Sequence, residues 1–371
     1  MSLITHYPYL PLRQLHRLSR AGRRQPERVR GILEEHFQRP VVVLNSGRTA
    51  IYLALAAMGL HRNDEVFVPP FLSHCVLGTM TRVAMPALQP SPRTRAIMVV
   101  HQFGYPQQME PLLAMARRRG WFVLEDCAYS LASGYRGKLL GLYGDAAIYS
   151  FPKTLGTVLG GCLVTDNSRI LDFAREYMRA RDRLGWKLFS NLSLLPVAMV
   201  YAGVEGKAGE RATQALEMAY SRFVEFPNPN PRVCKLFPLT RLELQATWQA
   251  RRRNLQIFAS YFQGSEYPED LESESEVVPF TVPYFHAPEM LSAVLDRLRS
   301  IRVKSDMYHF DVRRNLLAPD YRLCIPVPVH QNISESFMRT ICETIRAAVG
   351  KTLAQAASPG MSPALAGSSW S

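Results

Sequence analysis

The sequence predicts an α/β protein with a mostly parallel sheet flanked by helices and a smaller C-terminal α+β domain. From Pro40 onward, short β-rich runs alternate with helical patterns, as in parallel strands joined by crossover helices. The chain has 371 residues, of which 47% are hydrophobic, so it can bury a large core and a second, smaller one. We expect a basic helical segment at 1–39, a large domain at 40–235, a small domain at 236–350 and a disordered tail at 351–371.

Local patterns place the individual elements. Four apolar residues form the first expected strand, and the Asn-Ser-Gly turn that follows is typical of a helix start. The expected helices are Arg20–Gln38, Arg48–Met58, Met109–Arg119, Ile170–Arg183 and Arg241–Phe262. The expected strands are Val41–Leu44, Glu65–Val68, Ala96–His101, Trp121–Glu125, Ala146–Phe151 and Cys162–Thr165.

Residues 184–235 form an apolar insertion with a proline-rich end. Leu188–Val204 is largely apolar with basic flanks, which fits a buried helical hairpin or an element lying on a membrane surface. Its longest apolar run is too short to span a bilayer and contains Pro196. Peripheral membrane contact therefore stays open as the less favoured interpretation.

Composition narrows the class of protein. The formal net charge is +13, carried mainly by arginine, which fits a biased source composition, an anionic substrate, an acidic partner or a membrane surface. No zinc finger, basic helix or aromatic-studded strand is recognisable, so we expect no nucleic acid partner. The six cysteines form no C-x-x-C pair, which favours a reducing cytoplasm and argues against a metal site. The N-terminus lacks the apolar stretch of a signal peptide, because Pro8, Pro11 and Arg13 interrupt it.

Lys153 is the most informative residue. It follows a short apolar strand and precedes the Gly160–Gly161 pair, where a lysine can act as an amine nucleophile. Asp126 follows another β-rich run, Trp121–Leu124, and a carboxylate there could face the ring nitrogen of pyridoxal phosphate (PLP). Taken alone, Asp126 is equally typical of a helix cap and Lys153 of a solvated loop.

An anion site is predicted at the junction of a strand and a helix. Gly47 permits close backbone approach, and the first helical turn presents free N–H groups with a favourable dipole. Arg48 adds a charge, and Thr49 and Ser150 could add hydroxyl groups. An ordinary helix cap explains the same turn. His101, at the end of the central strand, either lines the pocket or satisfies a turn.

Several segments match motifs that occur together in one enzyme family. They are Ser46–Leu55 (phosphate turn and helix), Asn63–Pro69 (G-D-E-V-I-V-P), Glu125–Ala128 (E-D-x-A), Tyr135–Asp145 (hairpin) and Ser150–Gly161 (S-F…K…G-G). The chain thus resembles the DegT/DnrJ/StrS family of PLP-dependent sugar aminotransferases, which have fold type I. The resemblance covers Val41–Asp166 and continues more faintly to Val349.

The resemblance implies roles for particular residues. Lys153 would bind PLP covalently, and Asp126 would hold its ring nitrogen. Gly47, Arg48, Thr49 and Ser150 would hold its phosphate. Tyr129 stands where the family has Gln or His near the phenolic oxygen, and His74 or Phe71 would stack on the ring.

The resemblance also implies an activity. We expect transfer of an amino group from glutamate to a keto-sugar, carried on a nucleotide, in a cytoplasmic homodimer. The chain departs from the family in several places: two residues are missing between Phe151 and Lys153, the register of the stacking aromatic differs, the stretch from Met85 to Arg95 is short, and Pro238 replaces an Asn. These departures leave two alternatives open: other PLP chemistry, such as sugar dehydration or amination of a non-sugar ketone, and a non-catalytic scaffold.

Overall fold

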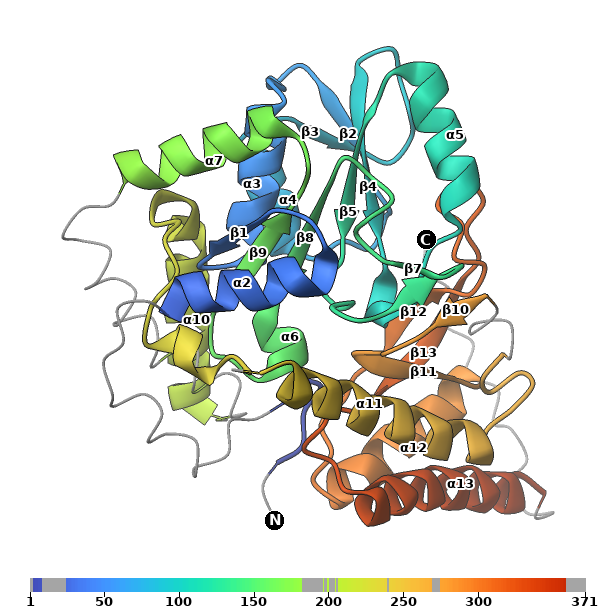
Figure 1. The fold of residues 1–371 in the computed structure, drawn as a ribbon. Coiled ribbons are helices and arrows are strands. Elements are labelled where there is room, and N and C mark those ends of the chain that lie inside the picture. Colours follow the sequence, from blue (N-terminus) through green and yellow to red (C-terminus); the bar gives the residue numbers. More distant parts are fainter. Residues whose placement is uncertain are drawn as a thin grey trace.

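The computed structural model describes residues 3–8, 25–181, 206–238, 240–268 and 274–357, with the isolated positions 196, 199 and 204. Its central sheet contains β1 (Val41–Leu44), β2 (Glu65–Phe67), β3 (Met85–Ala87), β4 (Thr94–Val100), β5 (Phe122–Asp126), β8 (Ala146–Ser150) and β9 (Gly161–Val164). The order is β1-β9-β8-β5-β4-β2-β3 (Figure 1). β9 runs antiparallel to both its neighbours, and the other pairs are parallel.

Helices cover both faces of this sheet. Alternate residues of a strand point to opposite faces, so β1 sends Val41 and Val43 to one core and Val42 and Leu44 to the other. The first core includes α2 (Gln25–Phe37) and α5 (Met109–Arg119). The second includes α3 (Gly47–Ala57), the end of α4 (His74–Met80) and α7 (Ser168–Ala180). Figure 1 shows this three-layer arrangement.

The C-terminal part has its own core against an antiparallel sheet. Strands β11 (Thr281–Phe285), β13 (Tyr321–Pro328) and β12 (Tyr308–Asp311) lie in that order. They pack with α11 (Arg241–Tyr261), α12 (Pro288–Ser300) and α13 (Glu335–Ala357). The N-terminal residue Ile4 joins this core and bridges Val303. The two ends of the described chain therefore meet in one unit.

Shorter elements connect these units. A hairpin of β6 (Gly134–Tyr135) and β7 (Lys138–Leu139) pairs with β10 (Ser275–Glu276). Its turn residues Arg136 and Gly137 have φ values of 45° and 74°, as a tight hairpin turn requires. The remaining elements are α6 (Phe151–Leu155), α10 (Gly206–Arg222), η2 (Gln102–Gly104), η3 (Phe223–Glu225) and η4 (Val233–Leu236).

The fold class predicted from the sequence is confirmed, and most elements begin and end within a few residues of the predicted bounds. Two features differ. Asp126 is the last residue of β5 rather than the residue after it, and β3 was not predicted because it is a short edge strand containing Pro86. The predicted domain boundaries stay a prediction.

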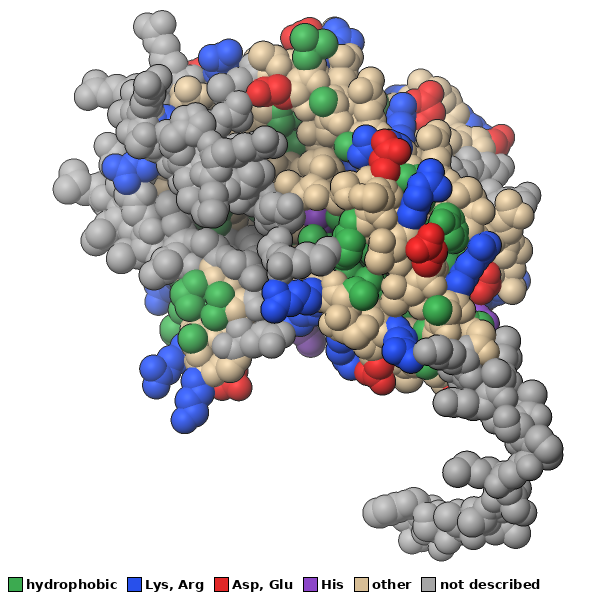
Figure 2. All heavy atoms as spheres, turned by 90° about the horizontal axis from the view of Figure 1, so that it is seen from below, with side chains coloured by type: hydrophobic (Ala, Val, Ile, Leu, Met, Phe, Trp, Pro, Cys, Tyr) green, Lys and Arg blue, Asp and Glu red, His purple; other side chains and the backbone are tan. Residues whose placement is uncertain are grey.

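The apolar insertion at Leu188–Val204 lies outside the described residues, apart from positions 196, 199 and 204. Among the described helices, none is both long and apolar enough to cross a membrane. On the face seen in Figure 2, lysine and arginine side chains lie among acidic and apolar ones.

Candidate active site

A cavity of about 360 Å³ lies beyond the carboxyl ends of β4 and β5. Ligands of open α/β sheets bind at this edge, because loops leave the strands there in different directions. The walls come from both parts of the molecule. The lining residues are Pro69, Phe71, Leu72, Ser73, His74, Val76, Val100, Gln102, Phe103, Gln107, Asp126, Tyr129, Lys153, Tyr308, Asp311 and Tyr321.

Lys153 enters the cavity from α6, a helix of one turn that begins directly after β8. Its Nζ lies 3.8 Å from the centroid of the Tyr129 ring. Within the described part of the chain, Nζ has no hydrogen bond and no carboxylate within ion-pair distance. The amine is half-buried and held only by the face of a ring, which attracts a cation weakly.

Asp126 lies in the same cavity at the end of β5 and is 4% exposed. Burial raises the pKa of its carboxyl group, and the positive charge of Lys153 partly offsets this rise. Among the described residues, its side chain accepts one hydrogen bond, from the Ala128 N–H to Oδ1 at 3.0 Å. A buried carboxylate with so few donors favours a cationic ligand.

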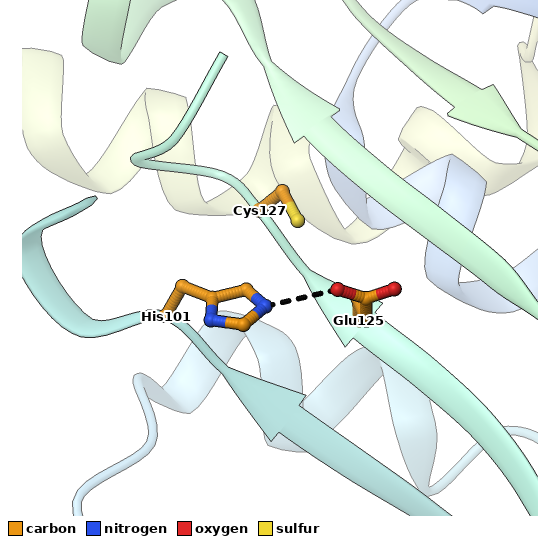
Figure 3. Close-up of side chains that lie close together, drawn as sticks. All are labelled: His101, Glu125 and Cys127. Carbon is orange, nitrogen blue, oxygen red and sulfur yellow. Dashed lines mark hydrogen bonds and ion pairs between the residues drawn. The ribbon is translucent and has the colours of Figure 1, made fainter. Parts of the chain in front are cut away.

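Glu125, the preceding residue, lies on the opposite face of the strand and is fully paired. Its two oxygens accept the N–H groups of Gly141, Tyr143 and Gly144 at 2.8, 2.7 and 2.5 Å. His101 Nε2 lies 3.1 Å from Glu125 Oε2 (Figure 3). Glu125 thus ties the end of β5 to the turn before β8, beneath the cavity.

His101 does not line the cavity. Its Nδ1 accepts the N–H of Gln107 at 3.2 Å, so Nε2 carries the proton that is donated to Glu125. The side chain is fully buried. The sequence allowed His101 either to line the pocket or to satisfy a turn. The first interpretation is corrected, because His101 is not among the residues that line the cavity and both of its ring nitrogens have protein partners.

One cluster within the described residues has the spacing of a metal site. The ligand atoms of His101, Glu125 and Cys127 lie within 4.8 Å of one another (Figure 3). Each has another explanation: the first two bind each other and nearby backbone, and burial raises the pKa of the Cys127 thiol well above its usual value. A protonated thiol is a poor metal ligand.

The predicted anion site lies where α3 begins beside the end of β8. A Cβ added at Gly47 would meet the Tyr149 carbonyl oxygen at 3.2 Å and the Ser150 Cβ at 3.6 Å. A Cβ at Gly161 would meet the Gly47 nitrogen at 2.5 Å, so Gly161 is needed for this close approach. The Ser150 hydroxyl has no hydrogen-bond partner among the described residues.

Arg48 extends this site toward α4. Burial raises the pKa of the Cys75 thiol, but the charge of Arg48 and hydrogen bonds from Ser73 and Arg48 outweigh it and lower that pKa. Lys153 contributes in the same direction, so the Arg48 and Lys153 charges both act at Cys75. A second cavity of about 700 Å³ shares Ser73 and His74 with the first and is lined by Arg48 and Arg82.

The Thr49 hydroxyl is turned away from this site. It donates to Asn45 Oδ1 at 2.6 Å and lies 3.2 Å from the Phe223 carbonyl oxygen, and the residue is fully buried. The Thr49 N–H is capped by Ser46 Oγ at 3.3 Å. The expected phosphate contact of the Thr49 hydroxyl is therefore corrected: it holds the side chain of Asn45, whose amide donates to the Phe223 carbonyl of η3 at 2.8 Å.

Aromatic side chains form the rim of the cavity. Phe71 is 52% exposed and stacks on His309 with ring centroids 4.5 Å apart. Its ring also meets Tyr321 edge-on. Phe71 thus lies at the entrance, whereas His74 lines both cavities. The choice of His74 as the residue that stacks on a bound ring stays a prediction.

The C-terminal part contributes residues that the sequence did not point to. Gln102 donates to the His309 carbonyl at 2.6 Å and accepts the Asp311 N–H at 3.2 Å, which holds β12 against the cavity. Tyr308 and Tyr321 complete that wall. No sequence motif could have indicated this wall of the cavity, because the bonds that place it join Gln102 to residues about two hundred positions away.

These residues fit PLP. The cavity offers an unpaired amine for its carbonyl carbon, at Lys153, and a bare buried carboxylate for a protonated ring nitrogen, at Asp126. The Ser150 hydroxyl and the first turn of α3 suit the phosphate. A volume of about 360 Å³ lies within the range of small-molecule pockets.

Comparisons with known proteins confirm the resemblance drawn from the sequence. Residues 88–189, which contain Asp126, Tyr129, Ser150 and Lys153, match the model of the DegT/DnrJ/EryC1/StrS aminotransferase family. The GDP-perosamine synthase of Escherichia coli O157:H7 is 34% identical over 38% of this chain and 43% of its own length. The chain spans less than half the length of the curated relatives it matches.

Solved structures share the fold over nearly the whole chain. The aminotransferase TlmJ from Streptoalloteichus hindustanus has a TM-score of 0.69 at 18% identity, covering 95% of this chain and 100% of that one. Spr1654 of Streptococcus pneumoniae in its PLP form has a TM-score of 0.69 at 16% identity, covering 95% and 99%. At this identity the likeness establishes the fold, and the site must carry the argument about chemistry.

Proposed function

We propose that this chain, which resembles the DegT/DnrJ/EryC1/StrS aminotransferases at its site, is a PLP-dependent aminotransferase. It would move an amino group from glutamate to the keto group of a sugar carried on a nucleotide. Surface polysaccharides and secondary metabolites are the product classes in which such amino sugars occur. The related E. coli enzyme carries a nucleotide-linked sugar in its name, which supports this substrate class.

A single observation carries the proposal. Lys153 and Asp126 share one cavity with their charges unpaired, although neutral or paired side chains would be more stable there. Such an arrangement is typical of a site whose ligand supplies the missing partners. PLP supplies a carbonyl for the amine, a ring nitrogen for the carboxylate and an electron-withdrawing ring that stabilises negative charge at the substrate's Cα.

Each residue would have a defined task. Asp126 would keep a proton on the ring nitrogen, because its carboxylate is buried and, among the described residues, accepts a single hydrogen bond. Ser150 and the first turn of α3 orient the phosphate, which fixes the position of the whole cofactor. Tyr129 supports the Lys153 amine from below with its ring face.

Lys153 would also move the proton. With its amine free once an amino donor has taken its place, Lys153 could take the proton from the donor's Cα and deliver it to the carbon that was the cofactor's carbonyl. A general base needs only a short reach for this transfer, and the amine is held by a ring rather than by a competing carboxylate. The second half of the reaction would run the same steps in reverse on the keto-sugar.

The adjoining cavity supports an anionic substrate. It is about 700 Å³ in volume, is lined by Arg48, Arg82 and one carboxylate, Glu217, and shares Ser73 and His74 with the Lys153 cavity. A diphosphate group attached to a sugar would suit these charges. We include in the proposal a homodimer, by family resemblance, and a reducing cytoplasm, with which the six free cysteines agree.

An absorbance experiment tests this function. The purified full-length protein is loaded with PLP, desalted and scanned before and after addition of glutamate. We expect a visible band from the lysine-bound cofactor that glutamate converts to a near-ultraviolet band, and that a nucleotide-linked keto-sugar restores. Lys138→Ala, at an exposed lysine, should behave as wild type. Absence of any band after incubation with PLP would contradict the proposal.

A further inference from the structure

Arg251 is a fully buried arginine in the middle of α11, outside the cavity. Within the described residues it has no carboxylate partner, because the hydrogen bonds of its guanidinium all go to carbonyl or amide oxygens. Burial lowers its pKa to about 9. A buried charge without a counter-ion destabilises a protein unless other groups compensate for it.

The contacts of Arg251 converge on the helix that bears Lys153. Its Nη2 donates to the carbonyl oxygens of Lys153 and Thr154 at 3.2 and 3.0 Å. α6 has only five residues, so its last carbonyls lack partners within the helix. A guanidinium at this end satisfies them and complements the negative end of the helix dipole.

The other side of the guanidinium holds the C-terminal part of the chain. Nη1 donates to the Pro279 carbonyl at 2.9 Å, and Nε donates to Gln331 Oε1 at 3.0 Å. Gln331 itself donates to the Thr154 carbonyl at 3.2 Å. The end of α6 is therefore bound directly and through Gln331 to segments that are distant in the sequence.

The segment at Pro279 continues to the floor of the cavity. The ring of Phe280 packs against Tyr129 with centroids 4.8 Å apart, and the Lys153 amine lies over that same Tyr129 ring. Phe280 N–H also donates to the Phe103 carbonyl at 2.7 Å. Arg251 thus holds both the backbone that carries the amine and the segment behind the ring that supports it.

We propose that Arg251 is a positioning residue that fixes the Lys153 amine in the cavity. It does so by joining the carbonyl end of α6 to the 279–280 segment and to Gln331. The positioning is a property of the cofactor-free chain, whereas its catalytic consequence rests on the proposed function. Arg251 touches neither the cavity nor the amine, so it acts through the backbone.

The test compares Arg251→Met and Arg251→Lys with Arg252→Met. Arg252 is the next residue on α11, is exposed, and pairs with Glu276 at 3.1 Å, which makes it a matched control. The cofactor-free, full-length proteins are treated briefly with acetic anhydride. The acetylation rate of Lys153 is read by peptide mass spectrometry against exposed Lys207, and melting temperature is followed in parallel.

We expect Lys153 to be acetylated several-fold faster relative to Lys207 in Arg251→Met, because α6 is released and the amine leaves the Tyr129 ring. Arg251→Lys should give a smaller increase, since an ammonium cannot reach both sides, and Arg252→Met should give none. A lowered melting temperature with an unchanged Lys153 to Lys207 ratio would overturn the proposal. Should Arg251→Met not fold, the ratio in Arg251→Lys decides in the same way.

A second measurement separates this inference from the proposed function. In the cofactor-loaded proteins, misplacement of the amine should lower kcat more than it raises KM for glutamate. If wild type itself shows no transamination, the proposed function fails, while the acetylation ratio still decides the role of Arg251. An unchanged kcat in Arg251→Met together with an unchanged acetylation ratio would leave Arg251 with stability alone and overturn the inference.

Discussion

Two neighbouring carboxylates on β5 differ in the number of hydrogen-bond donors that the protein offers them. The oxygens of Glu125 accept hydrogen bonds from three backbone N–H groups and from the His101 ring. Asp126 faces the cavity and accepts one N–H, from Ala128. The same contrast separates Arg251, whose donors all meet oxygens, from Lys153, which rests on a ring.

This difference distinguishes polar groups that stabilise the fold from polar groups that bind a ligand. Buried polar groups that hold a fold are satisfied by the protein itself, because an unpaired one is costly. Polar groups that bind a ligand lack some of their hydrogen-bond or charge partners in the protein. The protein tolerates this destabilisation because the polar groups around them have all their partners. In this molecule the complete layer, Glu125, His101 and Arg251, lies directly behind the incomplete pair, Asp126 and Lys153.

The largest expected effect is on activity in Lys153→Ala. Removal of the amine should lower turnover by at least roughly 10⁴-fold, because both cofactor attachment and proton transfer depend on it. The melting temperature of the cofactor-free protein should stay close to wild type, since the amine makes no hydrogen bond among the described residues. Transaminase assays and thermal melts measure both quantities. Normal turnover in this variant would contradict the role of Lys153 in cofactor attachment and proton transfer.

Asp126→Asn should separate chemistry from stability. The change keeps the shape and removes the charge, so we expect activity to fall by roughly 10²-fold or more while PLP still enters the cavity. In the cofactor-free protein, stability should be unchanged or higher, because burial already raises the pKa of this carboxyl group. A clear loss of stability in urea denaturation would mean that Asp126 holds the fold.

Glu125→Gln should give the opposite result. An amide keeps one acceptor oxygen, so its NH2 group must face either the N–H groups of Tyr143 and Gly144 or those of Gly141 and His101, and we expect the free energy of unfolding to fall by about 3 kcal/mol. Urea denaturation of the cofactor-free protein measures this. Equal stability of Glu125→Gln and Asp126→Asn would remove the contrast between the two carboxylates.

The smallest effect concerns acid sensitivity through His330. This ring is fully buried, and burial lowers its pKa from 6.5 to about 3. Below pH 6.5 the unfolded chain therefore binds a proton at His330 that the folded chain does not bind. The free energy of unfolding contributed by this group is at its maximum above pH 6.5 and falls as the pH is lowered toward 3. The loss at pH 5 should be about 2 kcal/mol.

His330→Gln should reduce the slope of this part of the pH profile, and the remaining slope should come from His6, whose pKa burial also lowers, to about 4. The variant His61→Gln, at an exposed histidine, serves as the control. Urea denaturation at pH 7 and pH 5 measures the difference. Identical slopes in His330→Gln and wild type would show that another group titrates.

The parallel sheet and the core of the site could be predicted because their signals are local. Lys153, Asp126 and Ser150 all lie at strand ends, and the topology brings such ends to one edge of the sheet. The order of elements followed from alternating patterns in the same way. The direction of β9, the short edge strand β3, the short helix α4 and the individual elements after α11 were not predicted from such signals.

The rest of the site depends on contacts that sequence spacing does not reveal. His101 and Thr49 have suitable side chains at suitable positions, but their partners are buried groups, the Gln107 N–H and Asn45 Oδ1. Which way such a side chain turns is decided by tertiary packing. Arg251 lies 98 residues from Lys153, and no local pattern connects them.

The most direct test of the central claim is to trap the cofactor on its lysine. The full-length protein is loaded with PLP, reduced with sodium borohydride, digested and mapped by peptide mass spectrometry, with Lys153→Ala treated in parallel. We expect the reduced cofactor on Lys153 and none on any lysine of the variant. Attachment at another lysine, or equal labelling of the variant, would contradict this claim.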